Sequence, residues 1–391
     1  MRREEITAAN YKRESLNWYE LALRIFPMLT VAWVRPFSLI LPGLISTYDL
    51  SLDEAGFAVN VLEVGGVTAM VMLGWTMDRW GAIRLISITL ALGSIALIAS
   101  TFSAGYETLL LAFFLIGIGN AATACAVNAL MAGGGEKRAF YLGLTHALFG
   151  VSSIAAPLIA GVIIGTSGWQ RYYLVIGVVG LVFAAAFHIA TYETRRSWRP
   201  ATTFSMSEGI IDVLRDIGPV CLGIAAMVGV QGVFNSWIYL DVVSRYEIEY
   251  SSAILTPAYL WVGILIGRTT HTWLADKIHP RRLLIASCVV AVCGAYGVSS
   301  APAFWLASSG LIVVGMGISG AYQLGTVWSV QLSPRRIGAA STFVMASAAL
   351  GSGVCTWITG IVVESRGFGA LPWVVSVVLG VGMVSFLMKR A

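Results

Sequence analysis

Two arginines stand isolated within long apolar stretches of the sequence. Arg35 lies ten residues after one stretch begins at residue 25 and precedes Pro36, and Arg268 lies eight residues before Asp276. At ~1.5 Å per residue of helix, both guanidinium groups would lie near the middle of a lipid bilayer. A charge at that depth costs at least ~2.5 kcal/mol, so each arginine is a candidate functional group. Because a guanidinium matches a carboxylate in shape and charge, the two arginines indicate a site for a small organic anion.

Two other ionisable side chains in apolar stretches are candidates for carrying a proton. Glu63, the only acid well inside a predicted span, lies fifteen residues before Asp78, which is ~22 Å along a helix. A buried carboxylate can take up a proton, although it can also serve as the fixed partner of an arginine such as Arg35. His146 is the alternative, because an unperturbed imidazole titrates near neutral pH. A lone histidine in a span is, however, more often a structural hydrogen-bonding group.

Polar side chains in other apolar stretches form a third set of candidates. Amides and phenols can hydrogen-bond a solute there, but hydrogen bonds between helices explain them equally well. We single out as candidate substrate-binding residues Asn120, Gln231, Asn235, Tyr239, Tyr322 and Gln323. The sequence has no nucleotide-binding loop, no nucleophile–histidine–acid set and no metal-ligand spacing. We therefore expect no enzyme activity, no cofactor and no bound metal.

The composition indicates an all-α membrane protein. The 391 residues are 57% hydrophobic and 12% charged, whereas a soluble domain has ~25% charged residues. Mean hydropathy is +0.80. A membrane-spanning helix needs ~20 apolar residues. The predicted spans are 25–46, 55–77, 84–103, 107–131, 139–164, 169–191, 217–241, 252–275, 283–301, 304–331, 338–362 and 369–388.

The basic residues are distributed unevenly between the two sides of the predicted membrane domain. Apart from the two arginines within spans, one side holds only Arg171, Arg245 and Arg366, and the side with the termini holds the other 20 of the 25. Basic residues are retained on the cytoplasmic side, so both termini are expected in the cytoplasm of a bacterium whose inner membrane the chain crosses. The net charge of +5 then reflects orientation, and we expect lipid, not nucleic acid, as its surroundings.

One polar segment divides the chain into two sets of six spans. Residues 192–216 are rich in charge and predict a cytoplasmic linker. The predicted domains are a bundle over 1–191, which includes a cytoplasmic segment 1–23, and a second bundle over 217–391. A short loop follows the second span of each half and contains an acid followed by bases, first at Asp78-Arg79 and again at Asp276-Lys277. This internal repeat indicates two related bundles around a central cavity.

The first of these loops carries a known signature. It fits Gly-x-x-x-Asp-Arg-x-Gly-x-x-Arg/Lys at Gly74, Asp78, Arg79, Gly81 and Arg84. With twelve spans, a central linker and a second copy of the loop, the whole chain resembles the major facilitator superfamily. The second copy departs from the pattern, because Thr272 replaces the first glycine and Pro280 lies in the turn.

The resemblance implies a mechanism of alternating access, in which the cavity opens to one side at a time. It also implies that charge pairs in the two loops hold the cytoplasmic side shut when the outer side is open. The candidate gating residues are Asp78, Arg79, Arg84, Asp276 and Lys277. The alternative is that these charges only fix the orientation of the chain in the membrane.

A shorter motif surrounds Arg268. The run from Gly267 to Asp276 resembles the monocarboxylate and oxalate/formate branches of the superfamily, in which an arginine at this spacing contacts the substrate carboxylate. Fucose-permease-like members also show this glycine–arginine pair, and the segment from Asn120 to Gly150 loosely resembles them. An intramembrane aspartate often precedes the arginine in the monocarboxylate branch, but Pro257 occupies that place here.

These observations favour secondary active transport of a small organic solute by a protein that can work as a monomer. The leading hypothesis is proton-coupled uptake of a small organic anion, because a proton offsets the charge that enters a negative interior. A neutral-sugar symporter is the first alternative. A drug/proton antiporter is the second, suggested by a degenerate glycine–proline motif that includes Pro157 and Gly161. A scaffold that transports nothing would have no need for arginines within the membrane.

Overall fold

A computed structural model describes residues 18–132, 138–192, 210–334 and 337–389. In these ranges the chain forms helices and no strand. The helices are α2 (Trp18–Trp33), α3 (Phe37–Tyr48), α4 (Leu52–Trp80), α5 (Ala82–Ser100), α6 (Tyr106–Ala132), α7 (Arg138–Ala190), α8 (Ile210–Arg245), α9 (Tyr250–Ala253), α10 (Thr256–Ala275), α11 (Pro280–Ser300), α12 (Phe304–Ile318), α13 (Ala321–Leu332), α14 (Ile337–Arg366) and α15 (Leu371–Met388), with a 3₁₀ turn, η3 (Phe368–Ala370).

The described helices account for twelve membrane spans. Ten helical segments are each long and apolar enough to cross a membrane, and the pair α2–α3, bent by 48°, forms one more. Helix α7 has 53 residues and is broken at Gly168, where φ is 80°, so it contains two spans. Glycine adopts a positive φ at little cost, because it has no Cβ atom. The prediction of an all-α membrane protein is confirmed, including the separation of α11 from α12 around Pro302.

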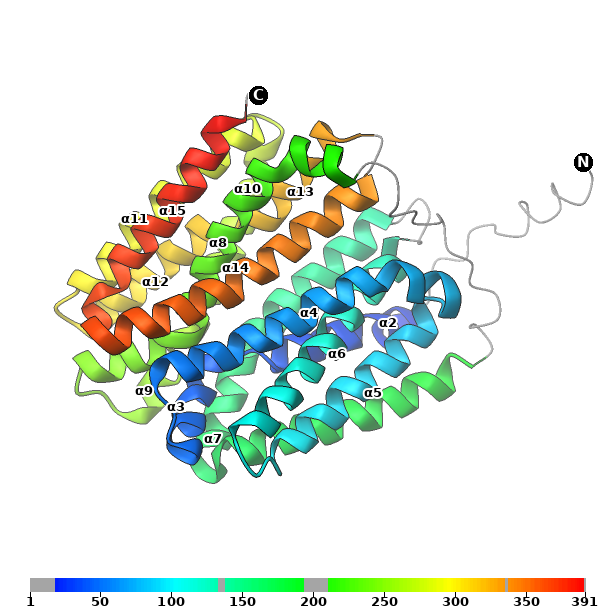
Figure 1. The fold of residues 1–391 in the computed structure, drawn as a ribbon, viewed down its shortest axis with the longest axis horizontal. Coiled ribbons are helices and arrows are strands. Elements are labelled where there is room, and N and C mark those ends of the chain that lie inside the picture. Colours follow the sequence, from blue (N-terminus) through cyan, green and yellow to red (C-terminus); the bar gives the residue numbers. More distant parts are fainter. Residues whose placement is uncertain (1–17, 133–137, 193–209, 335–336, 390–391) are drawn as a thin grey trace, which may run out of the picture.

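The helices form two bundles that lie side by side (Figure 1). Helices α2–α7 make the first and α8–α15 the second. The boundaries predicted for the domains remain predictions, because residues 1–17 and 193–209 lie outside the described part. Helix α8 begins at Ile210, so the last seven residues of the predicted linker are helical.

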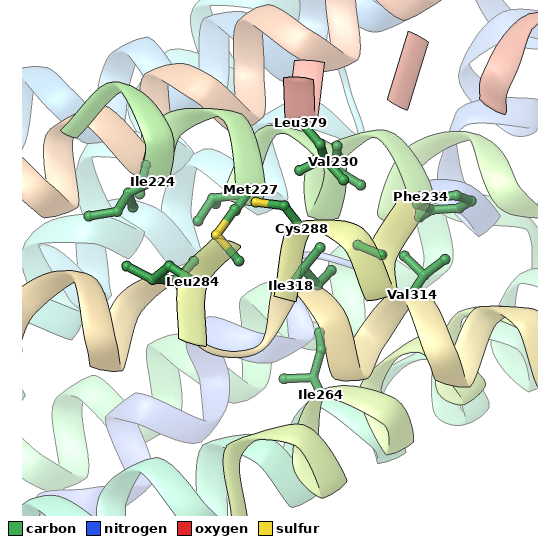
Figure 2. Close-up of a cluster of buried hydrophobic side chains, with 14 of the residues drawn as sticks. Ile224, Met227, Val230, Phe234, Ile264, Leu284, Cys288, Val314, Ile318 and Leu379 are labelled. Carbon is green, nitrogen blue, oxygen red and sulfur yellow. The ribbon is translucent and has the colours of Figure 1, made fainter. Parts of the chain in front are cut away.

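Each bundle has its own apolar core. In the second bundle, Ile224, Met227 and Phe234 of α8 face side chains of α10, α11, α12 and α15 (Figure 2). Close packing of this kind fixes each bundle as a unit. A further apolar cluster joins the bundles, because Val233 and Trp237 of α8 pack with residues of the first bundle.

The bundles are in close contact on the side where α3 ends and α4 begins, opposite the side where α2 begins and α15 ends. We call this side the distal face and the opposite side the terminal face. A Cβ atom on Gly360 of α14 would lie 2.5 Å from the carbonyl oxygen of Leu52 in α4, and one on Gly56 would lie 3.0 Å from that of Thr356. These glycines therefore allow α4 and α14 to approach closely.

The first span is interrupted between Trp33 and Phe37. Pro36 has no N–H group and cannot continue a helical hydrogen-bond ladder. The Arg35 N–H bonds to the carbonyl of Ala32 at 3.2 Å, one residue closer than in a regular α-helix. Arg35 therefore lies at the bend between α2 and α3, where its side chain can leave the helix stack.

Candidate substrate-binding site

An ion pair at the bend of the first span forms the centre of the site. Arg35 Nη1 lies 2.7 Å from Glu63 Oε1, and Nη2 lies 3.4 Å from Oε2. The Glu63 side chain is 3% exposed and that of Arg35 is 31% exposed. Ser352 of α14 donates to Glu63 Oε1 at 3.4 Å. The carboxylate therefore lies at the junction of the two bundles, held by one group from each.

The second arginine shares a neighbour with this pair. Tyr322 of α13 is close enough to Arg35, Glu63 and Arg268 to interact with all three electrostatically. Arg268 in turn interacts with His146 of α7. The structure thus brings five residues predicted from the sequence into one cluster, three from the first bundle and two from the second.

Arg268 differs from Arg35 in its hydrogen bonding. Its side chain is only partly exposed, yet no atom of the described residues accepts a hydrogen bond from its guanidinium. A guanidinium offers five donors, and buried donors are normally paired. Arg268 therefore has the capacity to bind an anion.

A small pocket lies between the bundles beside this cluster. Arg35, Ser153 and Pro157 line it from the first bundle, and Asn235 and Trp261 line it from the second. The Trp261 ring meets Phe149 edge-on, with 6.0 Å between ring centroids. The pocket therefore combines one charged group, an amide and aromatic surface. Pro257 also lines it.

Asn120 lies elsewhere, within the first bundle. It is buried, and its amide donates to the Val31 carbonyl at 3.5 Å. It lines a separate pocket between α2, α5, α6 and α7, which Val34 at the bend of the first span also lines. Its observed partner is therefore the backbone beside the bend, and its predicted role in substrate binding is untested.

The remaining polar candidates have other neighbours. Tyr239 packs against Tyr250 near the distal face, with ring centroids 6.3 Å apart. Gln323 is exposed and donates to Thr272 at 3.1 Å. Gln231 lies one turn before Asn235 on α8 and is partly exposed. Only Tyr322 and Asn235 of the polar set thus lie with Arg35.

The signature loops lie at the terminal face. Gly81 has φ 76° and its N–H bonds to Met77, so it ends α4 in a conformation that favours glycine. Arg79, Arg84 and Asp276 are exposed. Lys277 is also exposed, and its Nζ lies 3.5 Å from the centroid of the Trp273 ring. Asp78 belongs to α4, but its side chain lies outside the described part.

Hydrogen bonds join the bundles at the distal face. Glu364 of α14 accepts from the Leu52 N–H at 2.6 Å. The Tyr250 hydroxyl donates to the Gly161 carbonyl at 3.0 Å. By contrast, His146 is exposed in the terminal half of its span. The cluster is thus covered on the distal side.

Sequence reasoning missed several buried polar groups. Asp241, taken from the sequence as the last residue of a span, lies inside α8 and pairs with Arg245, whose Nε is 2.9 Å from Oδ1. Their spacing of four residues was a usable signal. His271 bridges Ser287 and Ser319 at 2.9 and 3.0 Å. No pattern in the sequence indicates those partners, because they come from other helices.

Two helical bundles with an ionisable cluster at their junction define the class of secondary transporters. Comparison with known sequences agrees. The chain belongs to the Major Facilitator Superfamily, whose sequence profile matches residues 25–324. It is therefore a multi-pass membrane transporter and not an enzyme.

Individual relatives are distant. The chain is 18% identical over 330 residues to the glucose/mannose transporter GlcP of Bacillus subtilis (strain 168), covering 82% of this chain and 81% of the relative. It is 28% identical over 254 residues to the cis,cis-muconate transport protein of Acinetobacter baylyi, covering 60% of each. A bacterial homologue of the human lysosomal transporter Spinster has the same fold, with a TM-score of 0.76 at 16% identity over 94% of this chain and 93% of that one.

Proposed function

We propose that this transporter carries a small organic anion into the cell together with a proton. The observation that supports this most strongly is Arg268, a partly buried guanidinium without a hydrogen-bond acceptor among the described residues. It interacts with Tyr322, which also interacts with the Arg35–Glu63 pair. A carboxylate bound there would satisfy Arg268 and draw the two bundles together.

Glu63 is the proposed proton carrier. In the structure its carboxylate forms an ion pair with the Arg35 guanidinium. A proton on Glu63 would remove the charge that holds Arg35, and both arginines would then be available to one substrate carboxylate. Each charge that enters against the membrane potential costs ~2.3 kcal/mol per 100 mV, so a proton that accompanies the anion offsets this cost. His146, beside Arg268, is the alternative carrier.

A neutral sugar is the second candidate substrate. GlcP, which is named as a glucose/mannose transporter, matches more of the chain than the muconate transport protein does. The pocket between the bundles also has groups that suit a sugar, namely Asn235 and Trp261. In that case Arg35 and Glu63 would have only a structural role.

The orientation and the gate follow from the same proposal. The bias of basic residues supports termini in the cytoplasm, and the proposed setting is the inner membrane of a bacterium, with the chain as a monomer. The terminal face would then be the cytoplasmic face. Asp78, Arg79, Arg84, Asp276 and Lys277 would form charge pairs across it when the distal face opens.

The test is ligand-dependent thermal stability of the purified protein in detergent. cis,cis-Muconate, gallate, glucose and mannose would each be added to the wild type, Arg268→Lys and Arg245→Lys. A ligand at 100 times its dissociation constant stabilises by ~2.7 kcal/mol. We expect a carboxylate to stabilise the wild type, and Arg268→Lys to weaken its binding ~10-fold because the planar fork is lost.

Arg245→Lys is the matched control, because Arg245 at the end of α8 already has Asp241 as its partner. It should lower the melting temperature without changing the affinity for the carboxylate. Stabilisation by the sugars alone, unaffected by Arg268→Lys, would establish the second candidate in place of the first.

A further inference from the structure

Three backbone carbonyls at the bend of the first span have lost their helical partners. In a regular helix the carbonyls of Val31, Trp33 and Val34 would accept from the N–H groups four residues later. Here the Arg35 N–H bonds to Ala32, and the Phe37 N–H bonds to the Arg35 carbonyl at 2.8 Å. Such carbonyls must find partners within the protein, because the membrane interior offers no water.

Side chains from two other spans of the same bundle supply those partners. The Tyr172 hydroxyl donates to the Trp33 carbonyl at 2.6 Å, and the Tyr173 hydroxyl donates to the Val34 carbonyl at 3.4 Å. Asn120 donates to Val31. Both tyrosines are fully buried. The bend is therefore held by α6 and α7.

We infer that Tyr172 is a positioning residue for Arg35. Its hydrogen bond is the shortest of the three and reaches the carbonyl two residues before Arg35. It fixes the direction in which the chain leaves α2, and with it the direction of the Arg35 side chain toward Glu63. Without the hydroxyl, the Trp33 carbonyl loses this partner, the bend is held less firmly, and the guanidinium is no longer confined to one place.

The consequence for transport rests on the proposed function. Tyr172, Tyr173 and Asn120 attach Arg35 to the first bundle, whereas Arg268 belongs to the second. The distance between the two guanidinium groups then changes only when the bundles move relative to each other. The contacts of an anion bound by both arginines would therefore change directly with that movement.

The experiment measures Arg35 itself and needs no substrate. The intact protein in detergent is treated with phenylglyoxal, and the modification rates of Arg35 and Arg245 are followed by peptide mass spectrometry. Arg245 is the internal reference, because it too is partly buried and paired with a carboxylate. Tyr172→Phe retains the ring and removes only the hydroxyl. We expect Arg35 to react ~5-fold faster relative to Arg245, the size of effect expected from one buried hydrogen bond.

Tyr106→Phe is the matched control. Its hydroxyl donates to the Glu54 carbonyl at 2.6 Å, so it loses a bond of the same kind and length, and among the described residues it bonds to neither Arg35 nor the reference Arg245. It should leave the Arg35 rate at the wild-type value. An unchanged Arg35 rate in Tyr172→Phe, or equal acceleration of Arg35 in both variants, would overturn the inference.

A second measurement separates this inference from the proposed function. The affinity for cis,cis-muconate is compared in the wild type, Tyr172→Phe, Arg35→Gln and the double variant. If Tyr172 acts through Arg35, its substitution weakens binding in the wild-type background and has no further effect in Arg35→Gln. Binding that is absent in all four proteins, or unaffected by Arg35→Gln, would reject the proposed function with this anion, while the modification rates still decide whether Tyr172 positions Arg35.

Discussion

The two ends of the interface between the bundles are built differently. At the distal face, α4 and α14 touch at Gly56 and Gly360, and the Glu364 carboxylate bonds to the backbone of α4. At the terminal face, Arg84 and Asp276 of the two signature loops are exposed. Close apolar packing with a few hydrogen bonds thus joins one end, and charged side chains mark the other.

This difference indicates how the distal and terminal faces could open and close in alternation. Backbone contacts through glycine form only at short range and are lost together when the helices separate. Charge pairs between loops can form and break with less movement, and their strength depends on how well water is excluded. The distal face is therefore expected to open as a unit, and the terminal face to close through pairs of charges.

The largest effect should come from a wedge in the distal face. A side chain at Gly360 would meet the Leu52 carbonyl, and overpacking of this kind costs ~1–3 kcal/mol. Gly360→Leu should therefore favour the open distal face and reduce substrate accumulation in reconstituted vesicles ~10- to 100-fold. Gly380→Leu is the control, because a Cβ there meets nothing within 4 Å. Equal losses in both variants would show that the contact at Gly360 has no special part.

Glu63 lies where the closed distal interface meets the site, and its substitution tests whether protons act there. A glutamine in place of Glu63 cannot take up a proton. Protonation at this position would therefore no longer control whether Arg35 is paired. Under the proposed function, wild-type uptake should rise as the external pH falls, because a proton on Glu63 would free Arg35. The variant should show no pH-driven accumulation but should retain exchange of internal for external substrate. Glu364→Gln is the control at the distal face, and pH-driven accumulation that persists in Glu63→Gln would move the proton to His146 or another group.

The sequence predicted the features of the molecule that depend on composition and periodicity, namely the spans and the charged residues within them. Hydropathy alone located the spans because lipid imposes a length of ~20 apolar residues. The cost of burying charge singled out Arg35, Glu63 and Arg268, and the structure brings all three together with Tyr322. The sequence left two roles open for Glu63, a carrier of protons or a partner of Arg35.

The sequence could not predict the side-chain roles that depend on which backbone groups lose their helical hydrogen bonds. The role of Tyr172 follows from the carbonyls freed at the bend, and these are visible only when the hydrogen bonds are traced. Asn120 was singled out for its polarity, but its partner is also a freed carbonyl. Asp241 lies inside a longer helix than hydropathy indicated, because α8 continues to Arg245.

A smaller effect is expected at the terminal face. Asp78→Asn removes the acid of the first signature loop and with it the proposed charge pairs that close this side. Turnover should fall ~5-fold, in line with the loss of one partly desolvated pair, while the affinity for substrate stays at the wild-type value. Asp276→Asn should act in the same direction through the second copy of the loop. Normal turnover in both variants would leave these charges with the role of fixing orientation only.

The smallest effect should follow from removing one hydrogen bond across the distal face. Tyr250→Phe deletes the hydroxyl that donates to the Gly161 carbonyl and keeps the ring against Tyr239. The bond spans the two bundles only while the distal face is closed, so its loss should shift the equilibrium toward the open distal face by ~2- to 5-fold. The readout is the labelling rate of a cysteine placed at Ser51, compared with Tyr106→Phe, whose hydroxyl bonds within the first bundle at Glu54. Faster labelling in Tyr250→Phe alone would assign the effect to the contact between bundles, whereas equal labelling would mean that packing, without this bond, holds the distal face closed.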